Sequence, residues 1–304
     1  MPSTLKWNAT LRATSSIAHG GETRGTITLL RRELVVQPDG RPVHVPIISG
    51  NAFRGRLRRI GEELLRDTLG YEGQLPLAAA HALRGGGALA KTSGTPLSGQ
   101  RLADLRALVP QVGVFGCAGG GRIVDGCLQT GKVVPYVAET AHILPATGHR
   151  LPAFDATQVE TYVRADDTSA HGFADALDTR RVIVDETGQP RLDELAEGTD
   201  STDEPSDTAL LMLYRIETFP AGTRFGTWLR LDRATDLEIA FFTDVLATFT
   251  AGAGRLGGRA AIGHGQVRCE LSRTVLAGSP HPADWRAHLQ EHRTAALTAL
   301  EALS

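Results

Sequence analysis

Hydrophobic and polar residues alternate at the start of the chain. The apolar positions 5, 7, 9, 11 and 13 are separated by polar residues, and this period of two predicts a β-strand with one buried face. A basic, β-branched segment at 20–36, a turn at Pro38-Asp39-Gly40 and a short apolar run at 43–48 follow. The chain therefore opens with strands that lead to a helix.

Apolar residues at 53, 57, 60 and 64 then step by four, three and four. This spacing is typical of a helix that packs on a sheet, and Ser49 or Asn51 provides a side chain to cap its start. Asn51, Arg54 and Arg58 share a different face, roughly 100–160° around the helix from Phe53. We therefore expect them to face solvent or a ligand, beside helix amides that add attraction for phosphate.

The rest of the chain follows the same two periods. Strands are predicted at 210–217, 225–231 and 266–275, with a turn at 220–222, a helix at 236–249 and a terminal helix from about 282. Residues 70–112 have the composition of an irregular insertion, and residues 133–207 that of a polar, turn-rich one. The pattern indicates an α+β fold in a single domain, residues 1–304.

A glycine-rich loop precedes the last predicted strand. Six glycines fall within the fourteen residues 252–265, together with Arg255, Arg259 and His264. Such density lets a backbone approach a ligand closely and aims several N–H groups at one anion, while the two arginines add charge. A flexible connection between helix and strand is the alternative.

Charge is distributed unevenly along the 304 residues. The formal net charge of -2 at first argues against a nucleic-acid partner. However, residues 1–60 hold ten Lys and Arg against three acids, whereas residues 150–207 hold five Arg against fifteen acids. Only three of the 32 basic residues are lysine, so arginine, which binds phosphate as a planar fork, supplies most of the positive charge. A GC-rich genome would also enrich arginine.

The cysteines and the hydropathy bear on location. Three cysteines, at 117, 127 and 269, lack the spacing of a zinc site or a redox pair, which favours a reducing cytoplasm. No stretch approaches the roughly 18 apolar residues of a membrane span, and the N-terminus lacks an apolar signal core. We therefore expect a cytoplasmic protein with no membrane partner.

Candidate catalytic and metal motifs are incomplete. His288, Glu291 and His292 match the H-x-x-E-H pattern of zinc enzymes, but the only later carboxylate, Glu301, lies too close along the same helix to complete a site. No G-x-S-x-G nucleophile motif occurs. We expect no cofactor, no metal and no catalytic residue.

Four segments, in the same order, resemble motifs of the RAMP superfamily of CRISPR-associated proteins. They are VPIISGNAFRGRLR at 45–58, VFG at 114–116, LYRIET with PAGT at 213–223, and RLGG with IGHG at 255–265. The long insertions and the Ser-Gly-Asn start of the helix are most similar to the repeated backbone subunit of type IV systems.

The resemblance implies a structure and a set of partners. It implies an RRM-like, ferredoxin-type antiparallel core with a lid insertion at 65–111 and a thumb-like hairpin at 133–185. It also implies copies that stack into a helical filament along single-stranded guide RNA, with other CRISPR-associated subunits and, through guide pairing, a target nucleic acid. The RNA-binding residues that we predict from motif and chemistry together are His19, Ser49, Asn51, Arg54, Arg58, Arg255, Gly257, Gly258, Arg259 and His264.

Catalysis separates the main hypothesis from its alternatives. Related type III backbone subunits cut target RNA with an aspartate upstream of the Pro-Gly motif, and residues 29–36 contain no Asp. A non-catalytic RNA-binding subunit is therefore the main hypothesis. The alternatives are a metal-dependent ribonuclease that uses Glu33, a guide-processing nuclease that uses His19, and an assembly protein that binds only other proteins.

Overall fold

The computed structural model describes residues 1–87, 99–119, 122–146, 150–164, 183–184, 190–191, 212–301 and 303. Contacts divide the chain into two units: Met1–Glu160 with Ile216–Ser304, here unit 1, and Thr161–Arg215, unit 2. In unit 2, the rings of Tyr162 and Tyr214 stack with centroids 5.6 Å apart. The short strands β11 (Ile183–Val184) and β12 (Pro190–Arg191) also pair there.

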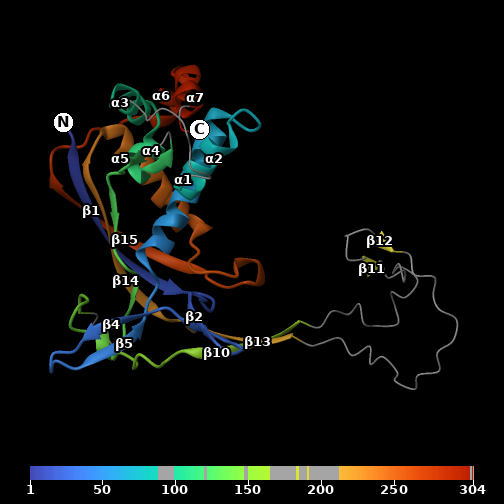
Figure 1. The fold of residues 1–304 in the computed structure, drawn as a ribbon. Helices are drawn as coiled ribbons and strands as arrows, with labels where there is room; N and C mark the ends of the chain where they lie inside the picture. The colour runs from blue at the N-terminus through green and yellow to red at the C-terminus, as the bar shows by residue number, and fades with distance from the viewer. Residues whose placement is uncertain are drawn as a thin grey trace. The chain divides into compact units, whose positions relative to one another are not determined.

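An antiparallel sheet forms the centre of unit 1 (Figure 1). The order of its strands is β15-β1-β14-β8, and β9 pairs with the N-terminal end of β14. The bounds are β1 Ser3–Ala13, β8 Leu128–Thr130, β9 Val134–Pro135, β14 Arg224–Ala234 and β15 Val267–Ala277. Trp7 lies opposite Leu229 on one side and Arg273 on the other, so β1 is paired along both edges.

Helices α1 (Gly50–Leu69) and α5 (Asp236–Thr248) pack on one face of this sheet. The buried side chains of β1 alternate with exposed ones, as its period of two predicts. Trp7 meets Phe242 edge to face at 5.4 Å between ring centroids, and Phe53 meets Phe249 at the same distance. The chain order is therefore strand, helix, strand, strand, helix, strand across one sheet.

Helix α1 begins and ends at the residues that its sequence favours. Ser49 is the N-cap, and its Oγ accepts a hydrogen bond from the Ala52 amide at 3.2 Å. Gly70 takes the left-handed conformation at the C-cap, with φ 59°, and its amide donates to Arg66 O at 2.8 Å. The predicted cap at Ser49 is confirmed.

Five further helices gather at one end of unit 1, around the second half of α1 (Figure 1). They are α2 Leu77–Gly85, α3 Gly99–Leu108, α4 Pro110–Phe115, α6 Trp285–Glu291 and α7 Arg293–Glu301. The predicted lid insertion at 65–111 contains α2 and α3, and residues 88–98 of it lie outside the described part of the chain. In the described residues, no helix is both long enough and apolar enough to span a membrane.

Smaller sheets lie at the other end of unit 1. One has the order β10 (Gln158–Arg164), β13 (Met212–Thr218), β3 (Ile27–Leu30), β2 (Gly20–Arg24). Strands β4 (Arg32–Val36) and β5 (Pro42–Pro46) form a hairpin there. Strands β6 (Cys117–Gly119) and β7 (Arg122–Val124) form another hairpin, which lies against α2 at the helical end of unit 1. Residues 147–149, 165–182 and 185 of the predicted thumb at 133–185 lie outside the described residues.

The prediction of an α+β chain is confirmed. The strands expected at 5–13, 210–217, 225–231 and 266–275 are β1, β13, β14 and β15, although residues 210–211 lie outside the described residues. The helix expected at 236–249 is α5. The terminal helix expected from about 282 is two helices, α6 and α7, because His292 leaves the helical conformation between them.

Candidate nucleic-acid interface

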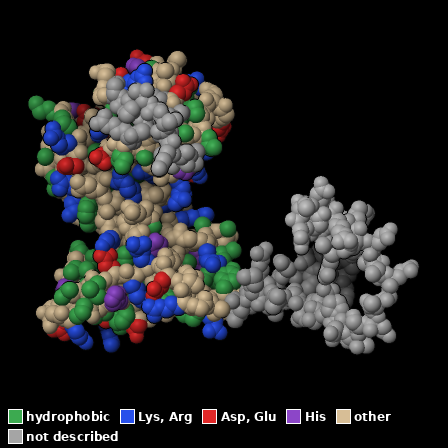
Figure 2. All heavy atoms as spheres, in the orientation of Figure 1, with side chains coloured by type: hydrophobic (Ala, Val, Ile, Leu, Met, Phe, Trp, Pro, Cys, Tyr) green, Lys and Arg blue, Asp and Glu red, His purple; other side chains and the backbone are tan. Residues whose placement is uncertain are grey.

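An open groove of about 760 Å³ lies at the N-terminus of α1. Four basic side chains line it, and Glu33 is its one acidic lining residue; the basic ones are Arg31, Arg32, Arg54 and Lys132. Lys and Arg side chains recur over the face of unit 1 that Figure 2 shows. The groove therefore carries a positive field although the whole chain is slightly acidic.

Only part of this charge is already paired. Arg32 donates to the buried carboxylate of Glu217 at 2.5 Å, and Lys132 forms an ion pair with Glu33. Arg31 is exposed, and within the described parts of the chain its side chain forms no ion pair. An anion that enters the groove therefore meets Arg31 first.

The start of α1 adds partial positive charge to the same groove. Asn51 is exposed there, and the first turn of this twenty-residue helix contains no acidic side chain. Ser49 Oγ accepts a hydrogen bond from the Ala52 amide, whereas the amides of Gly50 and Asn51 donate to no residue that the structure describes. The positive end of the helix dipole is thus not neutralised by the helix itself.

His19 holds the residue before the helix. The Ser49 amide donates to His19 Nε2 at 3.1 Å, so Nε2 is unprotonated and the ring is neutral. Burial lowers the pKa of His19, and the nearby charge of Arg31 lowers it further. His19 and Ser49, both predicted site residues, are therefore brought together, with Asn51 in the same first turn.

The glycine-rich loop is joined to His19 through the residues before it. The Gly258 amide donates to Ala18 O at 2.8 Å, and the Gly265 amide donates to Ser16 O at 2.8 Å. Gly257 has φ 78°, and a Cβ there would stand 2.2 Å from Ala18 O. Only glycine fits this approach. The helix start and the loop, which we predicted as two surfaces, are therefore connected through the segment Ser16–Ala18 and the adjacent His19.

The same contacts correct the expected role of the loop's amides. Six of them donate to carbonyls of the protein rather than facing solvent: those of Leu256, Gly258, Ile262, Gly263, His264 and Gly265. The glycine density therefore serves close packing of the backbone. Attraction for anions is left to the exposed side chains of Arg255 and Arg259.

Arg58 does not face solvent, and that expectation is wrong. Its side chain is 8% exposed and donates to Phe115 O and Gly116 O, both at 2.7 Å. Arg54, half-buried, donates to Phe115 O at 2.9 Å and to Leu128 O. Burial lowers the pKa of Arg58 to about 10, with a contribution from the charge of Arg54. Phosphate binding by Arg58 has no support from this geometry.

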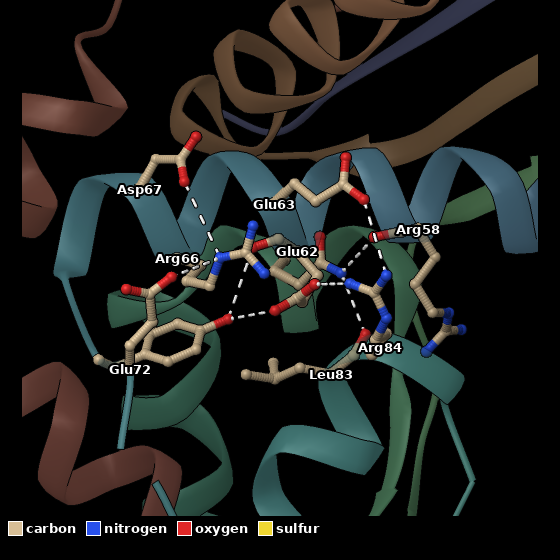
Figure 3. Close-up of polar contacts among 10 residues, drawn as sticks. Arg58, Glu62, Glu63, Arg66, Asp67, Glu72, Leu83 and Arg84 are labelled. Carbon is tan, nitrogen blue, oxygen red and sulfur yellow. Dashed lines mark hydrogen bonds and ion pairs between the residues drawn. The ribbon is translucent and has the colours of Figure 1, made fainter. Parts of the chain in front are cut away.

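A polar network explains why Arg58 is buried (Figure 3). On the same side of α1, Glu62 accepts from Tyr71 at 2.8 Å and from Arg84 at 2.5 Å. Gln111, which precedes Phe115 in α4, donates to Arg58 O at 3.0 Å. Helices α2 and α4 therefore cover the face of α1 that the helix pattern alone leaves open.

Arg56 and Arg59 are basic residues of the site that the sequence reasoning missed. Burial lowers the pKa of Arg56; Glu63 opposes this, whereas the positive charges of Arg59, Arg255 and Arg84 add to it. Such repulsion requires that Arg56 lie near Arg255 of the glycine-rich loop. The signal was present in the same segment, because Arg56 lies between Arg54 and Arg58, and Arg59 follows Arg58 directly.

His264 is a second residue whose surroundings differ from expectation. It is 3% exposed, with Nδ1 2.9 Å from Ser16 Oγ and Nε2 3.6 Å from a Glu160 carboxylate oxygen. Its ring therefore fixes the glycine-rich loop to the protein. This burial speaks against the predicted RNA contact.

Residues considered for chemistry are distributed as follows. Glu33 lies in the groove, beside Lys132. The rings of His288 and His292 are 4.5 Å apart between centroids in the terminal helices. Across the described ranges, no group of three or more His, Cys, Asp or Glu side chains is placed to hold a metal ion.

Comparison with known proteins finds similar chains among the solved structures. No protein-family model matches the chain, and no curated protein does. A chain of a solved structure described as "Type IV-B CRISPR Complex" is 35% identical, with a TM-score of 0.59; the match covers 91% of this chain and 95% of that one. The resemblance to type IV CRISPR-associated proteins is thereby confirmed. This chain belongs to the family of CRISPR-associated proteins found in the type IV-B CRISPR complex.

Proposed function

We propose that the protein is the repeated backbone subunit of a type IV CRISPR ribonucleoprotein complex, and that it binds single-stranded guide RNA through phosphates. The observation that carries this is the basic groove at the N-terminus of α1, within the segment that resembles the family's Pro-Gly motif. Copies stack along the RNA, and other CRISPR-associated subunits complete the complex.

The topology supports the core that the proposal requires. Two strand–helix–strand halves place β15, β1, β14 and β8 in the order fourth, first, third and second along the chain. That order, with both helices on one face, is the arrangement of a ferredoxin-like, RRM-like domain. The insertions between the helices and strands are then the lid and the thumb.

Binding follows from the charges around the groove. Arg31 and the first turn of α1 attract one phosphate, and Arg56 with Arg255 attracts others along the connected loop. These groups contact the backbone and not the base edges, so affinity depends little on sequence and strongly on salt.

The test is a titration with single-stranded RNA at increasing salt. The double variant Arg31→Gln with Asn51→Asp removes one charge and adds a carboxylate where α1 tolerates it, because acids stabilise helix N-termini. We expect at least tenfold weaker binding. Arg41→Gln is the matched control, since Arg41 pairs with Asp39 outside the groove. Salt-insensitive affinity, or parental affinity in the double variant, would refute the proposal.

Glu33 favours one second candidate, a metal-dependent ribonuclease, because its carboxylate lies in the same groove. Labelled guide and target RNA incubated with magnesium, and then with chelator, separates the two functions. We expect intact RNA in both. Specific cleavage that disappears in Glu33→Gln would replace the structural role with a catalytic one.

A further inference from the structure

The open face of the main sheet carries an exposed indole. Trp228 of β14 lies opposite Asn8 of β1, on the face that α1 and α5 leave uncovered. Its side chain is 40% exposed, whereas the chain's other two tryptophans, Trp7 and Trp285, are 4% and 2% exposed. Two residues before it on the same face, Gly226 has no side chain, and other side chains pack over it.

A hollow of about 870 Å³ surrounds this indole. Its basic lining residues are Lys6, Lys132 and Arg224, and its lining contains no Asp or Glu. Tyr136 and Leu144 stand over Gly226 and form one wall. On the other side, Gly131 lies so close to the indole Nε1 that a Cβ there would be 2.7 Å away, so the ring is held in place.

This hollow adjoins the groove at α1. Thr130 and Lys132 line both. A single strand whose phosphate lies at the start of α1 therefore reaches the hollow by passing one lysine. An extended polyanion such as a single-stranded nucleic acid can bind both of these adjacent basic regions at once.

We propose that Trp228 stacks on a base of the single strand whose phosphates are bound in the α1 groove, with Lys6 and Arg224 near the flanking phosphates. Every nucleobase presents a π-face, so stacking on an aromatic side chain adds affinity without reading sequence. Among the described residues that line the hollow, every charged side chain is basic, and this charge together with the exposed indole favours nucleic acid over an ordinary protein surface. This inference rests on the proposed function and adds a base contact to its phosphate contacts.

The experiment compares two ligands and three proteins. The ligands are single-stranded RNA and a strand of the same length whose central residues are abasic; the proteins are the parent, Trp228→Ala and Trp228→Phe. We expect Trp228→Ala to bind RNA about tenfold more weakly than the parent. The parent and Trp228→Ala should bind the abasic strand with the same affinity. Trp228→Phe, which keeps an aromatic ring, should retain most of the parent's preference for RNA over the abasic strand. RNA should also quench the parent's fluorescence, because Trp228 is its exposed tryptophan.

The outcomes separate this inference from the proposed function. Equal affinity of parent and Trp228→Ala for RNA, still falling with salt, overturns stacking and leaves phosphate binding intact. No RNA binding by any of the three proteins refutes the proposed function, and stacking with it. Self-association in the absence of RNA that Trp228→Ala abolishes assigns the hollow to a second copy of the chain and overturns the inference.

Discussion

At the scale of single residues, Arg58 illustrates how a charged side chain in a binding motif can be structural. Its guanidinium caps the end of α4 by donating to two successive carbonyls, and it remains charged because arginine keeps its proton even when burial lowers its pKa. The stability of α4, and of the chain from α2 that packs with it, depends on this one group.

Arg58→Ala should lower the free energy of unfolding by about 3 kcal/mol, because the buried Gly116 O loses its charged donor and Phe115 O keeps only that of Arg54. Urea denaturation followed by circular dichroism measures this. Arg59→Ala, at an exposed position on the same helix, should stay within about 0.5 kcal/mol of the parent. Unchanged stability in Arg58→Ala, with RNA affinity lost, would return Arg58 to the binding surface.

His19 makes stability depend on pH. Its pKa is lowered in the folded state from 6.5, so the unfolded chain binds the proton more readily, and stability falls as pH drops below about 6.5. We expect the parent to lose stability more steeply than His19→Ala between pH 7.5 and 5.5, in denaturation at matched salt. A His281→Ala control, at an exposed position, should keep the parental slope. Parallel curves for parent and His19→Ala would contradict this.

At the scale of elements, the glycine-rich loop acts as a connection between β15 and the segment Ser16–Ala18. Gly257 supplies the close approach, and hydrogen bonds of Gly258 and Gly265 hold the two backbones together. Because His19 follows immediately and accepts from Ser49, a displacement of the loop is transmitted to the start of α1.

Gly257→Ala should detach the loop, because the new Cβ would meet Ala18 O at 2.2 Å and φ is 78°. Hydrogen exchange read by mass spectrometry should then become faster in peptides that contain residues 16–19 and 256–258. Gly263→Ala is the matched control: φ is 91° but no atom lies within 4 Å, so only backbone strain is added. Equal protection in both variants would contradict a packing role for Gly257.

Elements were easier to predict from the sequence than the destinations of side chains. The period of two in β1 and the 4-3-4 steps of α1 report burial directly, and Ser49 and Gly70 mark the ends of α1 by local chemistry. The fate of Arg58 depends on Phe115 and Gly116, more than fifty residues away, and helix periodicity contains no such information. Trp228 gave no signal either, because an aromatic residue in a strand is ordinary.

At the scale of the whole molecule, net charge is a poor guide to partners. The chain has a formal charge of -2, yet most of the charged residues that line the groove at α1 and the hollow at Trp228 are cations. The local electric field of nearby cations, and not the net charge of the chain, attracts a phosphate, because charges are screened beyond a Debye length of roughly 8 Å at physiological salt.

The salt dependence of RNA affinity should report how many of these cations contact phosphates. Each cation that replaces a counterion on single-stranded RNA contributes about 0.7 to the slope of log affinity against log salt. Arg31→Gln should therefore reduce the slope by about 0.7, whereas Arg41→Gln should leave it unchanged. Titrations at four or more salt concentrations measure both; equal slopes would exclude Arg31 from phosphate contact.

The central position of β1 has a consequence for how the protein is made. Leu5 pairs with Leu231 on one side and with Val275 on the other, so β1 leaves the ribosome long before its two partner strands in the last third of the chain. Pairing across such sequence separation is slow, and an unpaired apolar strand is prone to aggregate while translation continues. We expect the nascent chain to need protection by chaperones until β14 and β15 emerge, after which the core closes around β1 in one step.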